Sequence, residues 1–174
     1  HFVGCYERLL MSILKSLTLV PLVLLLCACP KVKQSEPIQI SCLVTAVSDG
    51  DTIKCTDINK STHIVRLSQI DAPEKKQSFG TASKNALSTL IYKKNVDIQI
   101  LGQDQYGRNI GEIFLGDTNI NKVMVSSGYA WAYKEYVTDP EYNALESNAK
   151  NKTLGLWIEP NPLYPSIYRK QFKN

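Results

Sequence analysis

Histidine is nearly absent from this sequence. Only His1 and His63 occur among its 174 residues. This shortage excludes zinc hydrolases that hold their metal through paired histidines, and it excludes phosphodiesterases that use a histidine nucleophile. It also leaves the cysteines without partners for a soft-ligand metal site. The chemistry of this chain must therefore depend on other side chains.

The chain also lacks an apolar run long enough to cross a membrane. Its uncharged apolar block, Leu17 to Ala28, has twelve residues, whereas a membrane-spanning helix needs about 20. A block of this length behind a basic residue, Lys15, is typical of a secretory signal. We therefore expect Met11 to be the true start, residues 11–28 to be a signal peptide and residues 1–10 to be an upstream extension outside the native protein.

The expected signal ends in Leu26-Cys27-Ala28-Cys29, which resembles a bacterial lipobox. On this interpretation Cys29 is lipidated and becomes the first residue of an exported chain, anchored to a bacterial membrane in the periplasm or at the cell surface. Cleavage without a lipid is the alternative, because Cys27 is unusual at its place in such a motif. The polar stretch at residues 29–37 would be a tether.

The remaining composition fits one domain of ordinary size. The chain has 20 Lys and Arg residues against 16 Asp and Glu residues, and this small basic excess is compatible with a polyanionic ligand without identifying one. The sequence contains neither an internal repeat nor a low-complexity run. We expect the domain to span residues 38–160, followed by a tail at 161–174 with no clear secondary structure.

Cys42 and Cys55 lie on either side of a predicted turn. If the turn is centred near Ser48-Asp49, the two cysteines face each other across a hairpin, and export would place them in an oxidising compartment where nearby pairs form disulfides. A shift of register by one residue would instead put them on opposite faces. A disulfide and two free core cysteines are both open at this point.

The periodicity of apolar residues predicts five short strands with a helix between the third and the fourth. This order is typical of an α+β protein with an OB-fold, a five-stranded barrel, here with about three packed helices. The predicted strands are 38–44, 52–55, 63–67, 95–101 and 109–115, and the predicted helices are 81–93, 120–127 and 140–150.

Carboxylates gather at the ends of these strands. Asp51 belongs to the turn Asp49-Gly50-Asp51, and Asp71 and Glu74 follow the third strand in a segment stiffened by Pro73. Such oxygens, together with the carbonyl of Ala72, are the ligands that Ca²⁺ or Mg²⁺ prefers. By itself, however, Asp-Gly is a common turn signal, so the turn alone favours a structural role.

Two arginines accompany the carboxylates. Arg66 is on the third strand, and Arg108 follows a tight turn in Gln103-Asp104-Gln105-Tyr106-Gly107-Arg108. Acids, a divalent cation and guanidinium groups together suit displacement at a phosphate, because cations neutralise the charge that builds on its oxygens. Separately, Arg66 could be no more than a surface ion pair with Asp71.

Three motifs in order resemble the staphylococcal nuclease-like family: VSDGDTIKC at 47–55, VRLSQIDAPE at 65–74 and DQYGR at 104–108. The resemblance extends from Ile40 to Glu159, including GYAWAY at 128–133 and GLW at 155–157. It implies an OB-fold barrel and calcium-dependent hydrolysis of phosphodiester bonds in DNA and RNA with little sequence specificity. No protein partner is implied, and a monomer is expected.

The resemblance also implies roles for individual residues. Asp51, Asp71 and the Ala72 carbonyl would bind calcium, and Glu74 would contact it through water and act as general base. Arg66 and Arg108 would hold the scissile phosphate. The tyrosines expected to contact nucleotides are Tyr106, Tyr133 and Tyr136.

Some features depart from the family pattern. The loop from Glu74 to Phe79-Gly80 is short, with only Lys75 and Lys76 as basic residues. The motifs therefore do not define how this loop binds the substrate or which bases it prefers. A nucleic-acid-binding module without catalysis is the alternative function, and a structural envelope lipoprotein is a third. Retention of all the acids and arginines favours the enzyme.

Overall fold

The computed structural model describes residues 38–172. The expected extension, signal peptide, lipidation site at Cys29 and tether all lie outside the described residues. Between residues 38 and 172, no helix is long and apolar enough to span a bilayer.

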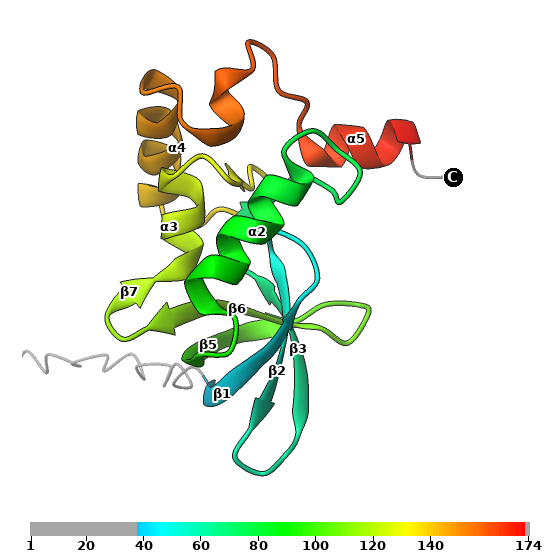
Figure 1. Cartoon of the computed structure of the whole chain (residues 1–174), viewed down its shortest axis with the longest axis vertical. Coiled ribbons are helices and arrows are strands. Elements are labelled where there is room, and N and C mark those ends of the chain that lie inside the picture. The colour runs from blue at the N-terminus through cyan, green and yellow to red at the C-terminus, as the bar shows by residue number, and fades with distance from the viewer. Residues whose placement is uncertain (1–37, 173–174) are drawn as a thin grey trace, which may run out of the picture. The chain divides into compact units, whose positions relative to one another are not determined.

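The strands of the main sheet follow the order β3-β2-β1-β5-β6-β7, and β3 also pairs with β6. The β3–β6 pairing is parallel and the other neighbours are antiparallel. Because β3 and β6 meet, five strands close into a barrel, which confirms the predicted α+β OB-fold (Figure 1). The strands are β1 (Ile38–Val47), β2 (Thr52–Asp57), β3 (Thr62–Leu67), β5 (Asn95–Gln103), β6 (Asn109–Leu115) and β7 (Thr118–Asn119).

A second, two-stranded sheet pairs β4 (Ile70–Asp71) with β8 (Trp131–Ala132). It follows the end of β3 after only two residues, so the segment that carries Asp71 leaves the barrel beside Arg66. Asp71 pairs directly with Trp131 in this ladder. Arg66 and Asp71 are thereby held by different sheets within a few residues of chain.

Alternating side chains of the barrel strands form the core. Val44 of β1, Ile53 of β2, Val65 of β3, Ile98 of β5 and Ile113 of β6 are all fully buried. Successive residues of a strand point to opposite faces, so this alternation directs one apolar set inward. The pattern is the same one that predicts the strands from sequence.

The helices α2 (Gly80–Ile91), α3 (Ile120–Ser126), α4 (Glu141–Asn151) and α5 (Pro165–Phe172), with the 3₁₀ turn η1 (Gly155–Ile158), complete the domain. Leu87 and Ile91 of α2 join the barrel core, and α3 packs against both β6 and α4. Figure 1 shows α3 and α4 side by side and α5, in red, next to the loop that precedes α2. The first three helices match the predicted ones closely.

The helix α5 corrects the prediction that residues 161–174 have no clear element. An isolated helix of eight residues is not stable in water, so its pattern is weak in sequence. Here Pro165 begins the helix, a position that suits proline, and its ring is buried. Contacts elsewhere in the fold hold the segment: Gln77 donates to the carbonyl of Leu163, and Lys134 N donates to Tyr164 Oη at 3.1 Å.

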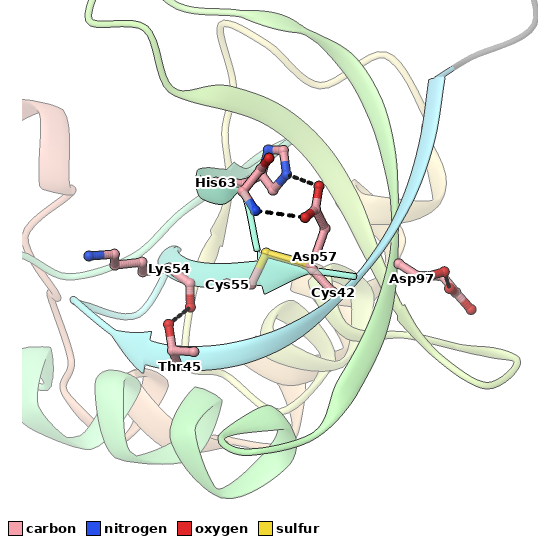
Figure 2. The surroundings of a disulfide bond; sticks show 9 residues. Cys42, Thr45, Lys54, Cys55, Asp57, His63 and Asp97 are labelled. Atoms are coloured by element: carbon pink, nitrogen blue, oxygen red, sulfur yellow. Dashed lines mark hydrogen bonds and ion pairs between the residues drawn. A yellow bond between two sulfur atoms is a disulfide. The ribbon is translucent and has the colours of Figure 1, made fainter. Parts of the chain in front are cut away.

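Cys42 and Cys55 form a disulfide with 5.7 Å between their Cα atoms (Figure 2). They are not directly opposite each other, because Val44 pairs with Cys55 and Cys42 pairs with Asp57. The ladder shifts between Val44 and Ala46, and the turn is centred near Gly50 rather than at Ser48-Asp49. The offset of two residues keeps both sulfur atoms on the inner face.

The disulfide closes a loop across a sequence separation of 13 residues. The double variant Cys42→Ala/Cys55→Ala should lower the free energy of unfolding by about 3 kcal/mol, the entropic value for a loop of this size. Urea titrations of both proteins with and without dithiothreitol measure the change. Reductant should shift the wild-type midpoint and leave that of the double variant in place; equal wild-type midpoints would contradict the stabilising role.

Candidate active site

The predicted site residues come from separate elements and meet at one cleft. Asp51 is in the β1–β2 turn, Arg66 on β3, Glu74 after β4, and Arg108 just before β6. All four line the cleft, together with Ala72, Tyr106, Tyr133, Tyr136 and Arg169. Asp71 lies beneath this lining with none of its surface exposed.

Arg66 connects two of the predicted carboxylates. Its Nη2 atom lies 3.4 Å from Asp51 Oδ2 and 3.2 Å from Asp71 Oδ1. Its Nη1 atom donates to the carbonyls of Leu67 at 2.9 Å and Ile70 at 3.0 Å. One guanidinium therefore holds the end of β3, the start of β4 and both acids in a single arrangement.

Asp51 is fixed on both carboxylate oxygens. Oδ1 accepts a hydrogen bond from Thr52 Oγ1 and Oδ2 accepts one from Ala72 N, each at 3.0 Å. The second bond places the backbone of Ala72 beside Asp51. The backbone is tied as well, because Leu67 N donates to Asp51 O at 2.8 Å.

Gly50 allows the turn to lie against the rest of the domain. A Cβ atom at this position would stand 1.9 Å from Ser83 Oγ on α2 and 2.8 Å from the Cβ of Ala72. No side chain fits at those distances. Gly50 thus brings Asp51 up to Ala72, while Asp49 Oδ1 closes the turn by accepting from Asp51 N at 3.1 Å.

Burial and mutual repulsion act on the acids of this cluster. Burial, followed by the nearby charge of Asp51, raises the pKa of Asp49 to about 6. Burial also raises the pKa of Asp71 to about 6, although Arg169 and Arg66 act in the opposite direction. Carboxylates in such surroundings favour a nearby cation.

Arg169 is a site residue that the sequence motifs miss. From α5 its Nη1 donates to Asp71 Oδ1 at 3.1 Å and to Glu74 Oε1 at 2.8 Å, while Nη2 donates to Asp71 Oδ2 at 3.0 Å. Glu74 thus joins Asp71 through this guanidinium. Arg169 is 95 residues from Glu74 and belongs to no motif, so no sequence signal identifies it.

Arg108 is brought to the cleft but not to the carboxylate cluster. Asp104 accepts from its backbone N at 2.9 Å and from its Nε at 2.7 Å. Partial burial opposes the effect, yet the hydrogen bonds from Arg108 lower the pKa of Asp104. Among residues 38–172, the two terminal nitrogens of Arg108 make no hydrogen bond, so they are available to an anion. Asp104 therefore orients the Arg108 side chain and leaves its two terminal nitrogens accessible.

Three tyrosines border the cleft. The guanidinium of Arg66 lies over the ring of Tyr133, 5.3 Å from its centroid. Tyr133 and Tyr136 contact edge to face at 4.7 Å, and Tyr106 is 72% exposed on the β5–β6 hairpin. Exposed aromatic rings near cationic groups suit the stacking of nucleic-acid bases. By contrast, Trp131 is buried against Trp157 at 5.4 Å, as expected of a core residue.

The donor set suits a hard divalent cation only if it is completed by groups other than acidic side chains. Within the described part of the chain, no three Asp, Glu, His or Cys side chains are arranged to hold a metal ion. The expected set relies on two carboxylates, from Asp51 and Asp71, with a backbone carbonyl and a water-bridged Glu74. The oxygens of the two carboxylates are of the kind that Ca²⁺ prefers, and in this structure they accept hydrogen bonds from Arg66 and Arg169.

Gln69 organises the surroundings of Asp71, and sequence reasoning does not single it out. Its Nε2 donates to Glu112 Oε1 at 2.6 Å, and its Oε1 accepts from Thr138 N at 2.9 Å and Asp139 N at 2.8 Å. Its backbone carbonyl accepts from Tyr133 N at 2.9 Å. The buried side chain of Gln69 therefore joins β6 to the entry of α4, and its backbone carbonyl adds the segment that contains Tyr133.

Replacing Gln69 should show how much these hydrogen bonds contribute to the free energy of unfolding. Gln69→Ala removes the side-chain hydrogen bonds to Glu112, Thr138 and Asp139, so we expect it to lower the free energy of unfolding by about 2 kcal/mol. Gln105→Ala, at an exposed position of the β5–β6 hairpin, is the matched control and should change stability by less than about 0.5 kcal/mol. Urea denaturation compares the three proteins, and equal effects of the two substitutions would rule out the network.

Comparisons with known proteins identify the family of this chain. The family described as "Staphylococcal nuclease homologue" matches residues 64–159. A protein of Haemophilus influenzae named "Uncharacterized endonuclease" is 46% identical over 133 residues, which cover 76% of this chain and 75% of that protein. A protein of Shigella flexneri named "Micrococcal nuclease" is 38% identical over 142 residues, covering 75% of this chain and 81% of the relative.

The chain therefore belongs to the staphylococcal nuclease homologue family, which confirms the resemblance seen in its motifs. The family match includes Arg66, Asp71, Glu74 and Arg108. It begins after Asp51, which the fold brings to Asp71, and it ends before α5. Arg169 thus reaches the cleft from a segment beyond the matched residues.

Proposed function

We propose that the protein is a nuclease that hydrolyses phosphodiester bonds of DNA and RNA with calcium and with little sequence specificity. The observation that carries the proposal is the Asp51–Arg66–Asp71 cluster at a cleft that is also lined by Arg108 and three tyrosines. Membership of the nuclease family supports it. Tyrosine rings can stack on any base, which suits an enzyme without sequence preference.

The residues of the cleft have distinct roles in this proposal. Asp51, Asp71 and the Ala72 carbonyl would hold calcium, with Glu74 contacting it through water; the bound ion would supply positive charge close to the reacting phosphate. Arg108 donates to phosphate oxygens from its terminal nitrogens, and Arg66 donates from Nε, because its four terminal N–H groups already have partners. Negative charge develops on these phosphate oxygens.

Glu74 completes the chemistry by accepting a proton. As the oxygen of water forms a bond to phosphorus, Glu74 takes the proton that water loses, and the bond from phosphorus to the leaving oxygen breaks. Arg66 is held by four hydrogen bonds to fixed partners. The position of Arg66 is therefore set before the substrate binds. The guanidinium can then stabilise the transition state without first having to move.

Export is part of the same proposal. Residues 11–28 would direct secretion, and Cys29 would carry a lipid that anchors the domain to a bacterial membrane, where it acts as a monomer without a protein partner. The Cys42–Cys55 disulfide supports this location, because disulfides persist in oxidising compartments.

Calcium dependence has a direct test. The protein should degrade single-stranded DNA and RNA when calcium chloride is added, and a chelator should stop both reactions because Asp51 and Asp71 then lose the cation. Release of acid-soluble nucleotides measures each rate. Undiminished cleavage in excess chelator would overturn the cation assignment.

Two substitutions test the assigned roles. Arg108→Ala removes a phosphate donor and Glu74→Gln removes the base, so each should lower turnover by at least about a hundredfold. Lys54→Ala, exposed on β2 and outside the cleft lining, should leave turnover unchanged. Circular dichroism checks the fold. Normal cleavage by both site variants would overturn the roles given to Arg108 and Glu74, whereas no cleavage by the unmodified protein would favour the binding module.

A further inference from the structure

The C-terminal helix places a cation on the two acids proposed to serve calcium. The guanidinium of Arg169 makes a bidentate pair with Asp71, which has no exposed surface, and its Nη1 also donates to Glu74. Bidentate guanidinium–carboxylate pairs are among the stronger hydrogen-bonded contacts in proteins. This contact is therefore a substantial part of how the acids are accommodated.

The contact engages the atoms that a metal would need. Both carboxylate oxygens of Asp71 accept from Arg169, and Oδ1 also accepts from Arg66. A divalent cation bound to the same oxygens would stand against the guanidinium, and like charges at such short range repel strongly. Arg169 and a cation on Asp71 therefore exclude each other in this arrangement.

The beginning of α5 is anchored independently of Arg169. Tyr164 accepts a hydrogen bond from Lys134 N and contacts Trp131 edge to face at 5.9 Å. The carbonyl of Leu163 accepts from Gln77, and Pro165 is buried. Arg169 is about one turn further along the helix, so its side chain can leave the acids while the start of α5 stays in place.

We propose that Arg169 is an internal counter-ion of the cation site. It neutralises Asp71 and Glu74 in the cation-free protein and is displaced when a divalent cation binds, so that α5 sets the cation concentration at which the site fills. The inference rests on the proposed function, because it takes Asp71 and Glu74 as groups that serve the metal. Arg169 lies outside the family-matched residues, which makes this regulation a property of the C-terminal segment.

Calcium titration of the full-length protein tests the proposal. Arg169→Ala removes the competing charge, so isothermal titration calorimetry with calcium chloride should give a Kd at least tenfold lower than that of the wild type. Lys170→Ala removes the same charge from the next, exposed position of α5. That control should bind calcium within twofold of the wild type, which separates competition at the acids from a general change in net charge.

Thermal unfolding supplies a second readout that does not depend on activity. In chelator, Arg169→Ala should unfold at a lower temperature than the wild type, because Asp71 and Glu74 have lost their counter-ion. Saturating calcium should close that gap. If Arg169→Ala does not fold, Arg169→Lys tests the same idea, since a lysine keeps the charge but cannot form the bidentate pair; it should bind calcium more tightly than the wild type.

The outcomes separate this inference from the proposed function. An Arg169→Ala protein that folds and binds calcium with unchanged or weaker affinity overturns the counter-ion role, even where the wild type shows calcium-dependent cleavage. Absence of calcium binding in every variant overturns both the cation site and the counter-ion. Tighter binding in Arg169→Ala with no cleavage of nucleic acid by the wild type supports the counter-ion and rejects the nuclease.

Discussion

Two carboxylates buried side by side are the constraint on which this site depends. Removing acids from water is costly, and Asp51 and Asp71 each raise the cost for the other. The fold offsets this with cations: Arg66 lies between the two acids, and Arg169 caps Asp71. Arg66 also binds the carbonyls of Leu67 and Ile70. The same guanidinium therefore neutralises the acids and fixes the backbone between β3 and β4.

The barrel makes this corner possible. The parallel pairing of β3 with β6 closes the sheet and fixes where β3 ends. At that point the chain leaves the barrel and enters β4. The β1–β2 turn packs against the segment after β4, because Gly50 has no side chain to separate the turn from Ala72. Arg108 arrives from the hairpin before β6. Acids and arginines that are distant in sequence converge because strand ends of a closed barrel are close in space.

Much of this arrangement could be predicted from the sequence. Alternation in β5 and β6 and the apolar face of α2 give nearly correct elements, because these segments are long enough for local periodicity to dominate. Asp51, Arg66, Asp71 and Glu74 are predictable because they lie in motifs. Gln69 is not, since its role arises from partners in β6 and before α4. Cys42 and Cys55 fall on one face as expected, but the irregular ladder after Val44 changes which residues they oppose.

The least predictable part, α5, lies outside the barrel strands and beyond the family-matched residues. The acids Asp51 and Asp71 and the guanidinium of Arg66 belong to the β1–β4 segment, whereas Arg169, which pairs with Asp71, belongs to a short helix beyond the family-matched residues. On the proposed counter-ion role, the cation ligands and the residue that sets their affinity lie in different parts of the chain. A substitution in the tail would then change the ion concentration that such a protein needs while every residue of the barrel stays the same.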